Sequence, residues 1–72
     1  MFQKYNATVT YAPFGFEGIV MRGLIGRTRK DAIELAKKTL TEVGIANGMK
    51  AWEANANCMS AKFQMSKVKS TQ

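Results

Sequence analysis

The chain has 72 residues, a net charge of +6, one cysteine and no histidine. With 46% hydrophobic residues it has enough apolar side chains for one modest core, which argues against a disordered or low-complexity class. A domain this small has little room for a deep active-site cavity, and without histidine it lacks the material for His-based catalysis or a Cys/His zinc site. The composition therefore predicts a small binding protein that is not an enzyme and has no cofactor and no metal.

The first predicted element is a strand over residues 2–12. Its apolar residues occupy alternate positions, namely Tyr5, Ala7, Val9 and Tyr11. This period of two is typical of a strand that is buried on one face. Pro13 has no amide hydrogen for a strand ladder and Gly15 accepts a positive φ, so the chain is expected to reverse there into a hairpin.

The second predicted strand covers residues 16–25. Apolar residues stand at both odd and even positions in this segment, from Phe16 to Ile25. Such a pattern indicates either a central strand buried on both faces or a strand with a bulge, and the bulge is expected near Gly23.

A helix follows, because Thr28 and Asp31 have the spacing of a capping box and Gly44 is a natural helix end. On a helical wheel the apolar residues share one arc: Ala32, Ile33, Leu35, Ala36, Leu40 and Val43. We expect this arc to lie on the sheet.

Residues 52–65 allow two interpretations. Apolar residues alternate from Trp52 to Cys58 and, after one slip of phase, from Met59 to Met65, which favours two short strands or one bulged strand. A helix is the rival, because Trp52, Met59 and Phe63 also fit helical spacing. In either case Tyr5, Tyr11, Trp52 and Phe63 fall on apolar faces and are predicted to belong to the core.

The predicted fold class is α+β. We expect a three- or four-stranded antiparallel sheet with one helix packed on one face, in the order strand, strand, helix, strand and, in the four-stranded case, a further strand. Residues 1–66 are predicted to form a single compact domain, and residues 67–72 a polar basic tail.

The positive charge is concentrated in residues 22–30, which carry +4. A helix N-terminus presents free amides and a positive dipole end, so cations beside it favour a phosphate contact, although an exposed basic loop beside a helix cap explains the same pattern. A second basic patch is expected near the C-terminus. The candidate anion-binding residues are therefore Arg22, Arg27, Arg29, Lys30, Lys62, Lys67 and Lys69.

Two functions fit these residues. The first is a non-catalytic binder of nucleic acid, DNA or RNA, that contacts phosphates through the basic loop and the helix N-terminus. The alternative is a small inhibitor or regulator, of the kind that phages encode, that docks on an acidic surface of a larger enzyme or complex. Phe2 and Phe14 would suit such a protein contact, and exposed sheet edges allow a homodimer.

The sequence also predicts a compartment. A lone cysteine, Cys58, forms no intramolecular disulfide and is expected to be a buried small hydrophobic residue, so a reducing cytoplasm is the expected location. The chain shows neither a signal peptide nor an apolar run of membrane-spanning length, and no membrane association is expected.

Two partial resemblances add expectations. The segment from Gly26 to Leu40, after two strands, resembles the C-terminal half of double-stranded-RNA-binding domains, whose last helix opens with Ser/Thr and a Lys-Lys-x-Ala-Lys motif. Arg29, Lys30 and Ala32 match the motif and Ile33 replaces its last lysine, so the resemblance implies phosphate contacts by Arg29 and Lys30.

The chain is also similar to the small sheet-and-helix domain of HicB-type antitoxins. The matching residues, in order, are Tyr5, Ala7, Gly15, Phe16, Thr28, Ala32 and Ile33. This second resemblance implies a small protein partner. As a whole the chain looks like a small phage-type accessory protein.

Overall fold

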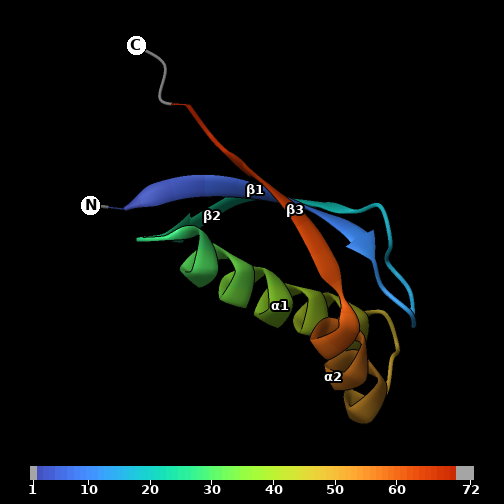
Figure 1. The fold of residues 1–72 in the computed structure, drawn as a ribbon. Helices are drawn as coiled ribbons and strands as arrows, with labels where there is room; N and C mark the ends of the chain where they lie inside the picture. Colours follow the sequence, from blue (N-terminus) through green and yellow to red (C-terminus); the bar gives the residue numbers. More distant parts are fainter. Residues whose placement is uncertain (1, 70–72) are drawn as a thin grey trace.

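The strand predicted at the N-terminus forms as β1 (Gln3–Tyr11) and is the central strand of the sheet. The computed structural model describes residues 2–69, and in it β1 pairs antiparallel with both β2 (Val20–Gly26) and β3 (Lys62–Lys67). Tyr5, Ala7 and Val9 are buried, as their alternation predicts. The α+β class with a three-stranded antiparallel sheet is thus confirmed (Figure 1).

The predicted hairpin joins β1 to β2 through residues 12–19. It begins with a turn in which the Gly15 N–H donates to the Ala12 carbonyl at 3.2 Å. The second strand starts at Val20 rather than at residue 16, because Phe16 has a left-handed backbone (φ 73°) that a strand does not allow. The Phe16 side chain packs against the core from this loop.

The bulge predicted near Gly23 is confirmed. Tyr5 pairs with Leu24 and Ala7 with Met21, so Asn6 faces two residues of β2 instead of one. Gly23 takes a φ of 73°, which a residue without a Cβ adopts freely, and its N–H donates to the Asn6 side-chain oxygen at 3.1 Å. The bulge turns both Met21 and Leu24 toward the core, which explains why this segment has apolar residues at both odd and even positions.

The predicted helix forms as α1 (Arg29–Ala46), with Thr28 as its N-cap. Its buried positions recur every four residues and most of them are small, so the helix approaches the sheet closely: Ala32, Ala36, Leu40 and Gly44. The predicted end at Gly44 is wrong. Gly44 lies buried where the second helix packs, and α1 ends instead at Ala46, with Asn47 as a C-cap whose N–H donates to the Val43 and Gly44 carbonyls at 3.1 Å each.

The strand favoured for residues 52–58 is also wrong, because the rival helix forms there as α2 (Ala51–Ser60). The Glu53 carboxylate reaches back to accept from the Lys50 N–H at 3.1 Å, which fixes the helix start. Ala54 and Asn57, three residues apart, are buried. The chain then returns to the sheet as β3, so the element order is β1-β2-α1-α2-β3, with two helices instead of one.

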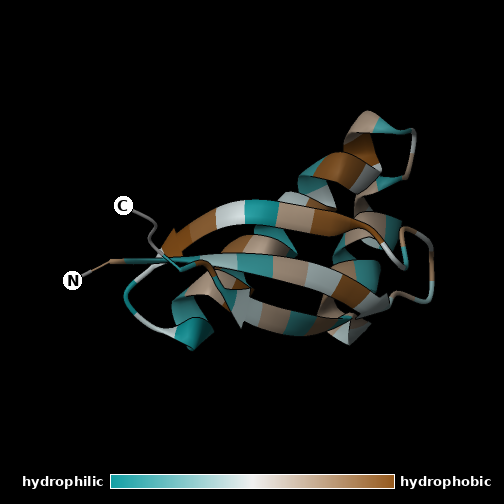
Figure 2. Ribbon diagram, turned by 90° about the horizontal axis from the view of Figure 1, so that it is seen from above, coloured by the Kyte–Doolittle hydropathy of each residue, from teal (hydrophilic) through white to brown (hydrophobic). Residues whose placement is uncertain are grey.

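Both helices lie on one face of the sheet, and the other face is open (Figures 1 and 2). The buried core between the layers consists of Tyr5, Ala7, Val9, Ala12, Met21, Leu24, Ala32, Ala36 and Leu40. The molecule measures 41 × 19 × 19 Å along its principal axes, so its two ends are well separated. No helix in residues 2–69 combines the length and apolarity needed to cross a membrane.

The last described residues continue the sheet. The Val68 N–H donates to the Lys4 carbonyl at 2.8 Å, beyond the end of β3 at Lys67. Residues 70–72 of the predicted tail lie outside the described part of the chain.

Candidate functional site

Four chain segments meet at one end of the elongated molecule. The antiparallel register brings the start of β1 beside the end of β2, since Gln3 pairs with Gly26, and beside the end of β3, since Tyr5 pairs with Lys67. The start of α1 follows directly after β2. Six exposed cations belong to these segments, and we call this region the cationic end: Lys4, Arg27, Arg29, Lys30, Lys67 and Lys69.

The carboxylate of Asp31 is the acidic group of the cationic end, and it is engaged in the helix cap. Its Oδ2 accepts from the Arg27 N–H at 3.2 Å, while the Asp31 N–H donates to the Thr28 Oγ1 at 3.2 Å. Thr28 thus caps the helix as predicted, but Asp31 accepts from the residue before the cap and not from the Thr28 N–H, so only half of the capping box forms. Because these bonds satisfy part of the helix terminus, a bound anion at this end must be held mainly by the long basic side chains.

Arg27 is oriented by an aromatic side chain. Its guanidinium carbon lies 5.4 Å from the centre of the Phe2 ring, within the range of a cation–π contact. Phe2 is 64% exposed, so this contact lies on the surface of the cationic end. The sequence suggested Phe2 as a protein contact, and its proximity to Arg27 follows only from the pairing of β1 with β2.

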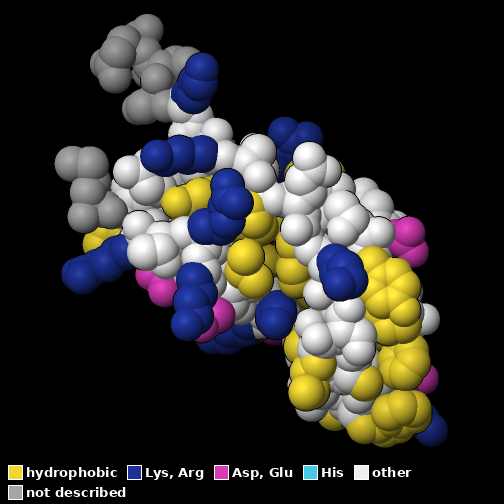
Figure 3. Space-filling model, viewed as in Figure 1, with side chains coloured by type: hydrophobic (Ala, Val, Ile, Leu, Met, Phe, Trp, Pro, Cys, Tyr) yellow, Lys and Arg dark blue, Asp and Glu magenta, His cyan; other side chains and the backbone are white. Residues whose placement is uncertain are grey.

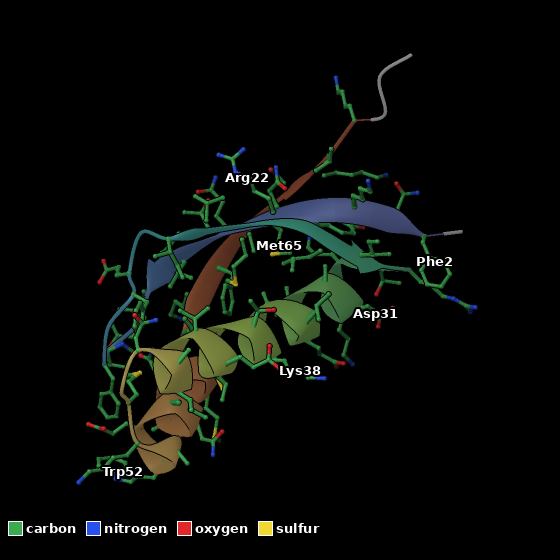
Figure 4. All side chains as sticks on the ribbon, turned by 180° about the vertical axis from the view of Figure 1, so that it is seen from behind. Phe2, Arg22, Asp31, Lys38, Trp52 and Met65 are labelled. Carbon is green, nitrogen blue, oxygen red and sulfur yellow. The ribbon has the colours of Figure 1, made fainter. Side chains whose placement is uncertain are left out.

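Arg22 and Lys62 lie elsewhere. Figure 4 shows Arg22 on the side of the sheet away from α1, whereas Asp31 lies at the start of that helix. Lys62 is exposed at the first position of β3, opposite Tyr11 and distant from the end of that strand. The strand register thus places Arg27, Arg29, Lys30 and Lys67 at one end of the molecule, with Lys69 on the segment beyond β3 that leads away from α1 (Figure 1), and it leaves Arg22 and Lys62 outside that group.

The open face of the sheet is polar and carries no acidic side chain. None of the three strands contains Asp or Glu. By alternation from the buried positions, and by the pairing of Tyr11 with Lys62 after the register shift, its side chains are those of Lys4, Asn6, Thr8, Thr10, Tyr11, Val20, Arg22, Ile25, Lys62, Gln64 and Ser66. Amides, hydroxyls and cations on one surface are suited to hydrogen bonds with an anionic polymer.

The opposite end of the molecule exposes aromatic side chains. Phe14 and Trp52 form an edge-to-face pair with ring centres 5.9 Å apart, and Trp52 is 62% exposed. The predicted placement of Trp52 in the core is wrong, because α2 turns this residue outward. Tyr11 is exposed as well, since a register shift between Val9 and Tyr11 ends the regular alternation of β1. Phe63 is half-buried against the core.

Cys58 is a free thiol and is half-buried against the core rather than fully buried. Its Sγ donates to the Asn55 carbonyl at 3.2 Å, within α2. In residues 2–69 no three Cys, Asp or Glu side chains stand close enough to hold a metal ion.

Replacement of Gly26 by alanine is expected to disrupt the entry into α1. A Cβ on Gly26 would lie 2.8 Å from the Asp31 Cβ and 3.0 Å from the Ala32 nitrogen, closer than van der Waals contact allows. Because the obstacles include backbone, the free energy of unfolding should fall by about 1–3 kcal/mol in a urea titration. The control is Ile25→Ala at the neighbouring exposed position. An unchanged urea midpoint for Gly26→Ala would contradict the close approach of Gly26 to Asp31 and Ala32.

No protein family matches the sequence, and no curated protein or solved structure is significantly similar to it.

Proposed function

We propose that this protein is a non-catalytic nucleic-acid-binding protein that contacts phosphates through its cationic end. The observation that carries the proposal is that six exposed cations belong to the described chain segments that meet at this end, where the carboxylate of Asp31 is engaged at the helix start. Lysine and arginine bind phosphate oxygens, and each neutralised phosphate releases counterions, which makes the binding favourable at low salt.

The arrangement of the cations favours a polymer over a small anion. They come from β1, the β2–α1 connection, the first turn of α1 and the end of β3 with the residues after it, so they are distributed across the end of the molecule. A nucleic-acid backbone presents phosphates at regular intervals over such a width, whereas a single phosphate ion would contact only one segment. The resemblance of Arg29 and Lys30 to the RNA-binding motif agrees with this assignment.

Weak sequence preference is part of the proposal. The open sheet face offers Arg22, Asn6 and Gln64 for hydrogen bonds, and among the described strands its one aromatic ring is that of Tyr11, opposite Lys62 and far from the cationic end. Phosphate contacts position a protein without reading sequence. The same proposal places the protein in the cytoplasm, where nucleic acid is accessible and the free Cys58 stays reduced.

The test is the salt dependence of binding to a labelled oligonucleotide, measured by fluorescence anisotropy for a duplex and a single strand. The wild-type plot of log affinity against log salt should fall with a slope equal to several phosphates. The double variant Arg27→Ala/Arg29→Ala should bind about tenfold more weakly at low salt and have a slope shallower by about 2. The reason is that each arginine accounts for about one released counterion.

The matched control is Lys38→Ala/Lys50→Ala, which removes the same charge from the middle of α1 and from the start of α2. Its slope should stay close to that of the wild-type protein. Equal losses of oligonucleotide affinity in the two double variants would show that the binding depends on net charge and not on the cationic end. An absence of binding to either oligonucleotide at low salt would overturn the proposed function itself.

A further inference from the structure

The helical layer leaves part of the sheet uncovered. α1 packs mainly on β2 and β1 and scarcely reaches β3, while α2 packs against α1 around Gly44 and Ala54. Phe63 and Met65 of β3 point toward the helices and pack against the core, yet both are only partly buried, whereas Ala7 and Val9 on the neighbouring strand are fully buried. The hydrophobic core is therefore not covered by a helix beneath β3.

The uncovered strip is about one strand wide. Strands lie about 4.8 Å apart and a helix with its side chains is about 10 Å wide, so one helix under β1 and β2 leaves β3 uncovered, and a further helix there would rest on β3 and on the side of α1. Figure 3 shows hydrophobic side chains exposed in a hollow between β3 and α1. We call this the β3 hollow and define it by Ile33 of α1 with Phe63 and Met65 of β3.

Lysines border the β3 hollow on both sides. Lys30 and Lys37 stand three residues before and four residues after Ile33, so all three share one face of α1. Lys67 follows Met65 on the same face of β3. Figure 3 shows basic side chains above and below the exposed hydrophobic atoms. Glu34 of α1, four residues after Lys30 and three before Lys37, is exposed beside these two lysines, so the border of the hollow carries three lysines and one carboxylate.

We propose that the β3 hollow binds an acidic amphipathic helix of a partner protein. The apolar face of that helix would contact Ile33 and Met65 and complete a layer of helices beneath the sheet, while its carboxylates would meet Lys30, Lys37 and Lys67. A second copy of this chain is a poor occupant, because each copy carries +6 and brings the same lysines. The charge around the hollow thus selects an acidic partner.

The probe is a synthetic peptide of about 18 residues with leucine at helical spacing on one face and glutamate elsewhere. Amide and methyl NMR shifts of the full chain are followed during titration with this peptide. The largest shifts should fall on Ile33, Lys37, Met65 and Lys67. Shifts confined to Phe14 and Trp52, or to the open sheet face, would overturn the proposal.

A pair of double variants tests the apolar contact. Ile33→Gln/Met65→Thr changes the β3 hollow and should weaken peptide binding at least about tenfold, the usual scale for truncated anchor residues. Leu35→Gln/Val20→Thr makes the same kinds of change at exposed positions of α1 and β2 and should leave peptide binding unchanged. Equal affinity of the two double variants for the peptide would contradict the assignment.

A charge reversal covers the case in which the apolar variant does not fold. Lys37→Glu/Lys67→Glu should weaken peptide binding at least as strongly at low salt, and Lys38→Glu/Lys50→Glu should do so much less. If the peptide fails to bind but a single-stranded oligonucleotide shifts the Met65 methyl resonance, the hollow holds nucleic acid and the acidic helix is excluded. The nucleic-acid proposal is tested only by the salt dependence of oligonucleotide binding. Failure of one proposal therefore does not imply failure of the other.

Discussion

Replacement of Leu40 by alanine is expected to leave much of the protein unfolded at room temperature. Leu40 is 1% exposed and, with Val9 and Asn57, is among the largest fully buried side chains. Truncation of a buried leucine costs about 2–5 kcal/mol, from the lost transfer free energy and the cavity that remains. A domain of this size has only about 3–5 kcal/mol of stability, so the loss is comparable to the whole. Far-UV circular dichroism during a urea titration measures it.

The matched change is Leu35→Ala, which makes the same truncation at an exposed position of α1. Its effect on the free energy of unfolding should stay within about 0.5 kcal/mol, as is usual for surface positions. If Leu35→Ala and Leu40→Ala shifted the urea midpoint equally, α1 would not face the sheet through its Ala32–Leu40 stripe.

The elements predicted correctly from the sequence are those whose cause is local. The alternation in β1, the turn after Ala12 and the cap at Thr28 each depend on residues within a few positions of one another. The bulge at Gly23 is local as well, because a glycine interrupts a strand whose apolar residues change parity. For these elements, the side-chain period and the backbone preference agree with the final fold.

The segment that forms α2 was assigned wrongly because two periods coincide in it. Alanine or cysteine at every second position imitates a strand, although alanine has the highest helix propensity. The contact that positions this helix is long-range, because Asn57 forms hydrogen bonds with the hairpin, more than 40 residues earlier in the chain. A local pattern contains no information about that contact.

The cationic end could be predicted only in part. The cations of residues 27–30 lie beside a helix start in the sequence, so their proximity is a local property. Lys67 and Lys4 join them through the pairing of β1 with β3, across more than 60 residues of chain. Arg22 is close to the loop cations in the sequence, but the alternation of β2 from the buried Met21 places it on the open face of the sheet.

The elongated shape separates two kinds of surface. The cationic end presents lysine and arginine side chains beside the exposed Phe2, whereas the β3 hollow and the Phe14–Trp52 pair offer apolar contacts on the helical side and at the far end. Lys30 and Lys67 belong to the cationic end and also border the hollow. If both proposals hold, an acidic helix and an oligonucleotide should compete, because both neutralise these two lysines.

Replacement of Asn57 by alanine should separate the hairpin from α2. Asn57 is 1% exposed; its Oδ1 accepts from the Phe14 N–H at 2.8 Å and its Nδ2 donates to the Gly15 carbonyl at 3.0 Å. Alanine leaves both partly buried backbone groups without partners, which should lower the free energy of unfolding by about 2–4 kcal/mol. A urea titration followed by Trp52 fluorescence measures the loss, because that side chain contacts Phe14 in the same hairpin.

Two further variants test whether the hydrogen bonds of Asn57 are the cause of this loss of stability. Asn55→Ala, at an exposed position of the same helix, should have little effect on the midpoint. Asn57→Asp keeps an acceptor for the Phe14 N–H, but its ionised form places a buried negative charge against the Gly15 carbonyl. Burial and that carbonyl both favour the protonated acid, so this variant should lose stability as the pH rises above about 4, the ordinary pKa of aspartate. A loss that is the same at acid and neutral pH would show that side-chain volume, and not the donor to Gly15, holds the hairpin on α2.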